Sequence, residues 1–322
     1  MGKHASGNQP VRSNVETDKS GKKKMIKEFH GIIPPVVTPL TTEQQLDIPG
    51  LERLLEHMIS GGVHGLFILG TTGEGPALGC SLQKEMIRET MRIVKKRLPI
   101  LTGISSPAFA DSVELANFSR SCGCNGVVAA PPCYFNLGDA ELTDYYRVLA
   151  GEVRQSLFIY NMPGMTKSYL KPALIRQLAE IDGIRGYKDS SGNMADFHDI
   201  ILTLGNREDF SIFVGPEELL GESVLMGADG GVAGGANLNP ALFVGMYNAA
   251  LQGDLLQMRI LQKNTYAQRR LYSLGKFQSS MIKGLKSALR QREICEDHLI
   301  APFNHFETDC AVQVAAILKE LF

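Results

Sequence analysis

Several features that mark specialised classes of protein are absent from these 322 residues. No apolar run approaches about 20 residues, the length that a membrane-spanning helix needs. The formal net charge is -1, so the chain has no basic surplus of the kind that binds nucleic acid. The 6 cysteines are scattered, with only Cys122 and Cys124 close together, and the 7 histidines do not cluster, so no zinc spacing exists. We therefore expect a protein of the reducing cytoplasm, with no metal, nucleic-acid or membrane partner.

The first 25 residues differ from the rest of the chain. They are polar, lack aromatic residues and end in a run of three lysines at positions 22–24. A secretory signal would need an apolar centre, which this segment lacks. Residues 1–25 are therefore predicted to form a disordered basic tail.

From Gly31 onward, short apolar segments alternate with amphipathic ones. Each apolar segment is bounded by Gly or Pro, as is typical of parallel strands buried on both faces. The predicted strands are 31–37, 65–69, 100–103, 126–130, 157–160, 184–188, 210–214 and 231–234. Eight strands alternating with helices favour the α/β class, specifically a (β/α)8 TIM barrel. A doubly wound open sheet is the alternative, and it is weakened because no Gly-x-Gly-x-x-Gly follows the first strand.

About seventy residues follow the eighth unit, and a barrel does not need them. Segments 254–271, 279–290 and 308–321 have helical patterns. We expect a catalytic barrel over residues 26–252 and a C-terminal helical appendage over 253–322, which packs on the barrel and at an oligomer interface.

Segment 184–192 (Ile-Arg-Gly-Tyr-Lys-Asp-Ser-Ser-Gly) is an apolar strand that ends on Lys188 and opens into a polar turn. Burial at such a position lowers the pKa of a lysine. A neutral amine near pH 7 requires a shift of roughly 3 units, or about 4 kcal/mol. Such an amine can attack a ketone and form a Schiff base. The alternative is a lysine that extends to the surface at the strand end.

In a barrel, functional groups gather where the strands end, at the C-terminal face. The polar residues just past the predicted strands are Thr71, Thr72, Tyr134, Tyr160, Lys188, Glu217, Glu218 and Asn237. A lysine, two tyrosines and two threonines in one pocket suit carbonyl chemistry: an imine, a proton shuttle and hydroxyls that hold a carboxylate. Each residue alone also has a purely structural explanation, such as packing for a tyrosine or a turn for Thr-Thr-Gly.

Three ordered motifs carry a family resemblance. They are 70–74 (Gly-Thr-Thr-Gly-Glu), 160–163 (Tyr-Asn-Met-Pro) and 186–189 (Gly-Tyr-Lys-Asp). Together they resemble the dihydrodipicolinate synthase / N-acetylneuraminate lyase family of class I pyruvate-dependent aldolases, from Gly31 to the C-terminus. The resemblance implies a barrel, usually a homotetramer arranged as a dimer of dimers, that binds pyruvate as a Schiff base without a separate cofactor.

The resemblance also implies roles for individual residues. Lys188 would form the imine, Tyr160 would transfer protons and Thr71 would relay protons to Tyr160. Tyr134 would be contributed to the active site of a neighbouring subunit. For substrate binding, Thr72 would hold the pyruvate carboxylate, Val232 would present its backbone carbonyl to the pocket, and Glu217 and Glu218 would bind substrate hydroxyls. The alternative for the two glutamates is that they complement the dipole of a helix N-terminus.

One position departs from the synthase pattern. Where those enzymes have an arginine that binds the carboxylate of the aldehyde substrate, this chain has Met165, and the nearby Lys167 points elsewhere in the simplest register. We therefore favour a Schiff-base lyase or aldolase for 2-oxo-3-deoxy sugar acids, with pyruvate and an aldehyde as partner molecules. The alternatives are a dihydrodipicolinate (4-hydroxy-tetrahydrodipicolinate) synthase, which condenses pyruvate with aspartate semialdehyde, and a non-catalytic barrel that binds a 2-oxo acid.

Overall fold

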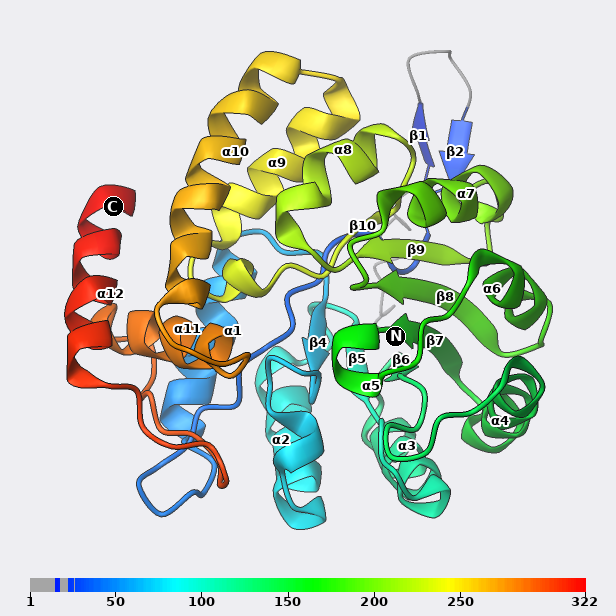
Figure 1. Ribbon diagram of the computed structural model, residues 1–322, viewed down its shortest axis with the longest axis horizontal. Coiled ribbons are helices and arrows are strands. Elements are labelled where there is room, and N and C mark those ends of the chain that lie inside the picture. The colour runs from blue at the N-terminus through cyan, green and yellow to red at the C-terminus, as the bar shows by residue number, and fades with distance from the viewer. Residues whose placement is uncertain (1–14, 18–22, 26) are drawn as a thin grey trace, which may run out of the picture.

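The computed structural model describes residues 15–17, 23–25 and 27–322, and its centre is a ring of eight parallel strands (Figure 1). The strands are β3 (Gly31–Ile32), β4 (Leu66–Ile68), β5 (Ile100–Gly103), β6 (Gly126–Ala129), β7 (Ser156–Asn161), β8 (Ile184–Asp189), β9 (Ser211–Val214) and β10 (Gly230–Gly231). They pair in the order β3-β10-β9-β8-β7-β6-β5-β4. The ring closes where the Val36 N–H donates to the Phe67 carbonyl at 2.8 Å. The predicted (β/α)8 barrel is confirmed.

Helices follow the strands and form the outer layer. Around the barrel these are α1 (Ile48–Ser60), η1 (Gly75–Ala77), α2 (Cys80–Val94), α3 (Phe109–Cys122), α4 (Asp139–Val153), α5 (Pro163–Thr166), α6 (Pro172–Ala179), α7 (Met194–Leu204), η2 (Glu217–Leu219), α8 (Leu220–Leu225), η3 (Gly234–Asn237) and α9 (Pro240–Gln252). None of the helices in the described ranges is long and apolar enough to cross a membrane.

The first and the last predicted strands each have only two residues in the structure. The first ends at Ile32 because Pro34 and Pro35 have no N–H to donate to a strand ladder; pairing resumes only as a bridge between Pro35 and Phe67. The last, predicted over 231–234, is Gly230–Gly231, and η3 begins at Gly234.

The apolar core has two layers. Side chains alternate along a strand, so each strand contributes one set to the barrel interior and another to the helices outside. The interior layer contains Phe29, Ile33, Phe67, Leu101, Val128, Ala130, Phe158, Tyr160, Phe213 and Val232. The larger outer layer joins the strands to the surrounding helices. Because the interior is filled with side chains, chemistry is confined to the two ends of the barrel.

The C-terminal appendage lies against one side of the barrel (Figure 1). It contains α10 (Leu255–Arg269), η4 (Arg270–Ser273), α11 (Ser280–Gln291) and α12 (Thr308–Leu321), close to the predicted helices. The predicted disordered tail falls mostly outside the described residues. Within it, β1 (Val15–Thr17) and β2 (Lys23–Met25) pair in antiparallel register, and disorder of the remainder stays a prediction.

Candidate active site

Lys188 lies inside the barrel near the C-terminal end of β8. Gly186 and Lys188 face the interior, while Tyr187 and Asp189 face outward, as the two-residue period of a strand requires. Only 6% of Lys188 is exposed. Its Nζ lies 4.0 Å from the centre of the Tyr160 ring and 4.9 Å from that of Phe67. Burial lowers the pKa of Lys188, an effect that the neighbouring Tyr160 only partly offsets. The alternative, in which this lysine extends to the surface at the strand end, is therefore wrong.

Tyr160 is the neighbour of Lys188 in the strand register. Its hydroxyl lies 3.5 Å from Thr71 Oγ1 and accepts from Ser190 Oγ at 3.4 Å. Burial by itself raises the pKa of Tyr160, but the Lys188 ammonium and the hydroxyls of Ser190 and Thr71 together lower it below the usual tyrosine value. The phenol oxygen therefore has hydroxyl neighbours from two loops, the one after β4 and the one after β8.

Ser190 was not predicted as a site residue. It follows Lys188 by two positions, so strand alternation places both on the interior side. The turn after it is held by Asp189, which accepts from the Ser191 N–H at 2.7 Å, from Ser191 Oγ at 3.0 Å and from Asn161 Nδ2 at 3.3 Å. Burial raises the pKa of Asp189 to about 6. The polar turn after the strand thus aims Ser190 at Tyr160.

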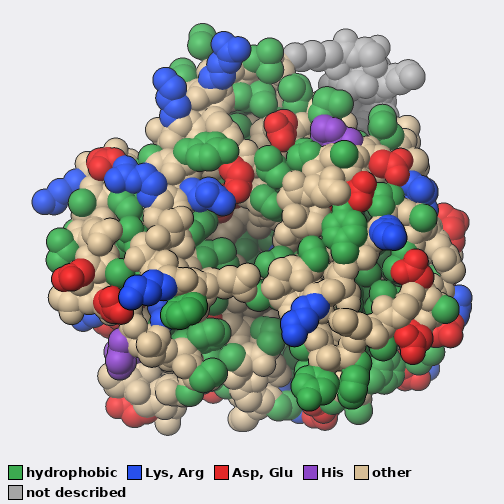
Figure 2. Space-filling view, viewed as in Figure 1, with side chains coloured by type: hydrophobic (Ala, Val, Ile, Leu, Met, Phe, Trp, Pro, Cys, Tyr) green, Lys and Arg blue, Asp and Glu red, His purple; other side chains and the backbone are tan. Residues whose placement is uncertain are grey.

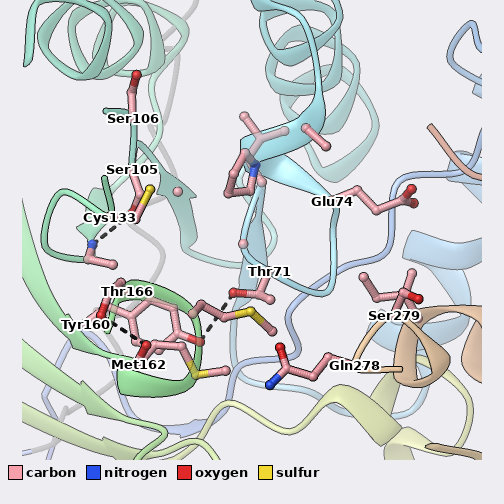
Figure 3. A pocket seen from close by; sticks show the side chains of 18 of the residues that line it. Thr71, Glu74, Ser105, Ser106, Cys133, Tyr160, Met162, Thr166, Gln278 and Ser279 are labelled. Carbon is pink, nitrogen blue, oxygen red and sulfur yellow. Dashed lines mark hydrogen bonds between the residues drawn. The ribbon is translucent and has the colours of Figure 1, made fainter. Parts of the chain in front are cut away.

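A cavity of about 400 Å³ opens above this group, and the face shown in Figure 2 is hollowed near its centre. Its polar lining comes from Thr71, Glu74, Ser105, Ser106, Cys133, Tyr160, Thr166, Gln278 and Ser279 (Figure 3). Its apolar lining includes Met162 and Met165. Glu74 is the only charged residue in the described lining, and it is paired with Lys286. Lys167 does not line the cavity, and the described lining contains no lysine or arginine.

Thr72 and Glu217 do not line this cavity, but one oxygen of each lies near Gly234. A methyl group on Gly234 would lie 3.6 Å from the Tyr272 hydroxyl and 3.9 Å from both Thr72 Oγ1 and Glu217 Oε2. Burial raises the pKa of Glu217 to about 7, although its Oε2 accepts from the Gly235 N–H at 2.7 Å. We call these three oxygens, Tyr272 Oη, Thr72 Oγ1 and Glu217 Oε2, together with the side-chain-free Cα between them, the Gly234 cradle. Its carboxyl group can donate as well as accept a hydrogen bond near neutral pH.

For three more of the predicted residues the structure describes the side chain, while the predicted direction of the Val232 backbone carbonyl stays a prediction. Glu218 forms an ion pair with Arg269 of α10 at 3.0 Å, so the structure does not bring it to the cavity. Asn237 binds backbone groups only: it accepts from the Val37 N–H and donates to the carbonyls of Pro35 and Gly234. The Val232 side chain belongs to the barrel interior.

Tyr134 also lies away from the cavity of its own chain. It is 81% exposed and forms an edge-to-face pair with Phe135, which is 72% exposed. The neighbouring Cys133 does line the cavity. The loop after β6 therefore turns outward at Tyr134 and projects an aromatic pair into solvent.

Comparison with known proteins agrees with this architecture. The model of the dihydrodipicolinate synthetase family matches residues 28–321. A probable 2-dehydro-3-deoxy-D-pentonate aldolase of Escherichia coli, YjhH, is 34% identical over 260 residues, 80% of this chain and 86% of that protein. Among solved structures, dihydrodipicolinate synthase from Bacteroides thetaiotaomicron is 46% identical (TM-score 0.87, covering 91% and 98% of the two chains). YagE of E. coli, solved with pyruvate, is 29% identical (TM-score 0.86, 91% and 98%). The predicted resemblance is confirmed: the chain belongs to the dihydrodipicolinate synthetase family.

Proposed function

We propose that this protein is a pyruvate-dependent carbon–carbon lyase that works through an imine on Lys188. The observation that carries the proposal is the buried Lys188 amine, held 4.0 Å from the Tyr160 ring, with Thr71 and Ser190 at the Tyr160 hydroxyl. Desolvation favours the neutral amine, which is the nucleophilic form. A barrel that only bound a 2-oxo acid would gain nothing from an amine that is costly to bury.

The proposed chemistry begins when the neutral Lys188 amine adds to the C2 carbonyl of pyruvate. The former carbonyl oxygen takes one proton from the amine and one from solvent and leaves as water, which produces a protonated imine. The imine withdraws electrons, so the methyl carbon loses a proton to Tyr160 and becomes an enamine carbon. That carbon forms the new bond to the aldehyde, whose oxygen takes up a proton. Hydrolysis of the imine releases the product, and the reverse sequence cleaves a 4-hydroxy-2-oxo acid. Thr71 relays the proton from Tyr160. The chemistry needs no metal or organic cofactor.

The cavity lining supports a 2-oxo-3-deoxy sugar acid as the substrate. Its described walls provide hydroxyl, amide and apolar groups and contain no lysine or arginine; Lys188 lies beside Tyr160, which is part of these walls. An aldehyde that carries hydroxyl groups suits these walls, whereas aspartate semialdehyde would bring a second carboxylate without a partner. YjhH, named as a probable 2-dehydro-3-deoxy-D-pentonate aldolase, agrees with this choice. The B. thetaiotaomicron protein is named as a synthase, so synthase activity remains the alternative that experiment must decide.

We assign the binding of substrate oxygen atoms to the Gly234 cradle, through Thr72 and Glu217. A protonated Glu217 can donate to a hydroxyl or a carboxylate oxygen. The cradle exists because residue 234 has no side chain.

We also propose that the protein acts as a homotetramer, a dimer of dimers in which Tyr134 enters a neighbouring subunit's active site. Two neighbouring aromatic side chains, Tyr134 and Phe135, are mostly exposed in the single chain. A projecting aromatic pair is typical of a protein interface.

Lys188 is expected to be the residue that pyruvate modifies. Borohydride reduction in the presence of pyruvate should attach the three-carbon unit to Lys188, as read by peptide mass spectrometry. Lys188→Met should abolish both labelling and turnover while the protein remains folded, because methionine has a similar volume and no amine. Lys167→Met is the control and should label normally. Label on another lysine, or none, would contradict the assignment.

Substrate choice is expected to favour the sugar acid. Compared as kcat/KM, cleavage of 2-oxo-3-deoxy sugar acids should exceed condensation of pyruvate with aspartate semialdehyde by at least about tenfold. Met165→Arg should raise the synthase reaction by about 10- to 100-fold, since a charge-assisted hydrogen bond contributes about 1.5–3 kcal/mol. If the unmodified protein is instead a tenfold better synthase, the interpretation of Met165 is wrong.

Gly234→Ala is expected to fill the cradle without disturbing the fold, because the new methyl group would make ordinary contacts of 3.6–3.9 Å. The KM for the sugar acid should rise about tenfold, the loss expected for one displaced hydrogen bond of about 1.4 kcal/mol. Gly245→Ala in α9 is the matched control, since its methyl group would meet only Leu261, at 3.6 Å. Equal KM values for the two variants would remove the cradle from substrate binding.

Sedimentation is expected to show a tetramer. Tyr134→Phe should keep the tetramer and lower kcat by at least about tenfold, because it removes a hydroxyl that acts in catalysis. Tyr266→Phe, at a half-exposed tyrosine of α10, is the control and should keep full activity. A monomer that is fully active at low concentration would overturn both the assembly and the role of Tyr134.

A further inference from the structure

Glu74, the last residue of the Gly-Thr-Thr-Gly-Glu motif, has no role in the mechanism proposed above. Glu74 is fully buried and forms an ion pair with Lys286 of α11 at 2.5 Å; the two side chains are 0% exposed. Its other oxygen accepts from the Ile300 N–H at 2.9 Å. Lys286 also donates to the His298 carbonyl at 2.6 Å. Through this set of contacts, which we call the Glu74 clamp, the turn after β4 is attached to the C-terminal appendage.

The Glu74 side chain takes no part in the reaction itself. In Figure 3 it points away from Thr71 and Tyr160. Its backbone, however, belongs to the reacting turn, because the Glu74 N–H donates to the Thr71 carbonyl at 3.1 Å. A displacement of Glu74 would therefore displace Thr71.

The turn holds an unfavourable backbone conformation. Leu69 and Glu74, on either side of residues 70–73, have φ angles of 59° and 57°, which side-chain-bearing residues adopt at an energetic cost. Such a conformation persists only when its surroundings hold it. On one side the Thr38 hydroxyl donates to the Gly73 carbonyl at 2.7 Å. The Glu74 clamp is the anchor on the other side.

Stability alone does not account for a buried ion pair at this position. Removing two charges from water costs about as much as their attraction returns, so apolar replacements are often equally stable. The geometric effect is specific, because Thr71 Oγ1 and the Tyr160 hydroxyl are 3.5 Å apart, at the limit of a hydrogen bond. A small shift of the turn would break this contact.

We infer that Glu74 and Lys286 are positioning residues, through which the C-terminal appendage holds Thr71 within reach of Tyr160 for proton transfer. The inference rests on the proposed function. It predicts a defect confined to one step: removal of the proton from the methyl carbon of the pyruvate imine, with imine formation at Lys188 left intact.

The test uses the double variant Glu74→Gln with Lys286→Met, which removes both charges together and keeps an oxygen to accept from the Ile300 N–H. Borohydride trapping of pyruvate measures imine formation. Exchange of the pyruvate methyl protons in D2O measures the step at Tyr160 and Thr71. We expect trapping within about threefold of the unmodified protein and exchange slower by at least about tenfold. Adding Thr71→Val to the double variant should slow exchange no further, because both changes interrupt the same contact.

The matched control is the second buried ion pair, Lys27 with Asp229 at 2.8 Å, next to Phe210 at the N-terminal end of β9. Lys27→Met with Asp229→Asn should change neither trapping nor exchange. If the Glu74 double variant does not fold, Glu74→Asp replaces it; this change keeps the charges and shortens the side chain, and it should slow exchange alone.

Unchanged exchange in a folded clamp variant, or equal losses of trapping and exchange, would overturn the inference. Absence of trapping in the unmodified protein would instead contradict the proposed function.

Discussion

The burial of one amine sets the constraints on the rest of this structure. Lys188 is surrounded by Tyr160, Phe67 and the apolar interior of the barrel. A charged amine is unfavourable there, and in the proposed mechanism this cost makes the amine a usable nucleophile. The closed ring of strands holds the lysine in these surroundings, while the cavity opens beside Tyr160. The barrel therefore provides the electrostatic environment of the site as well as its support.

The polar groups of the candidate site come from separate parts of the chain, each from the C-terminal end of a strand or just after it. Thr71 follows β4, Tyr160 lies on β7, Ser190 follows β8, and Glu217 lies in η2. Local hydrogen bonds hold these groups in place. For example, the Ser191 N–H donates to Asp189 in the turn that carries Ser190, and the Gly235 N–H donates to Glu217. Proton transfer and substrate binding can thus be altered separately, by changes in different loops, while the amine keeps its position.

The C-terminal appendage takes part in this arrangement. It contributes Gln278 and Ser279 to the cavity, the Tyr272 hydroxyl to the Gly234 cradle and Lys286 to the Glu74 clamp. A barrel without these helices would keep Lys188 and Tyr160 but would lose one wall of the cavity and the support of the Thr71 turn. Changes in this appendage would therefore alter the shape of the cavity in this chain.

The amino-acid sequence by itself determined the order of strands and helices, because buried parallel strands are short, apolar and bounded by Gly or Pro. The sequence also put Lys188 at the end of a strand but left open whether the side chain is buried, which the structure decided. With Lys188 inside the barrel, strand alternation would have found Ser190. Tertiary structure decided what no local pattern contains. Glu217 and Glu218 are adjacent in sequence, yet one is buried at the Gly234 cradle and the other pairs with Arg269. Glu74 and Lys286 are 212 positions apart and meet only because α11 packs beside the turn after β4. The physical reason is that periodicity reports which face of an element is buried, whereas the partner of a buried charge depends on how distant elements pack.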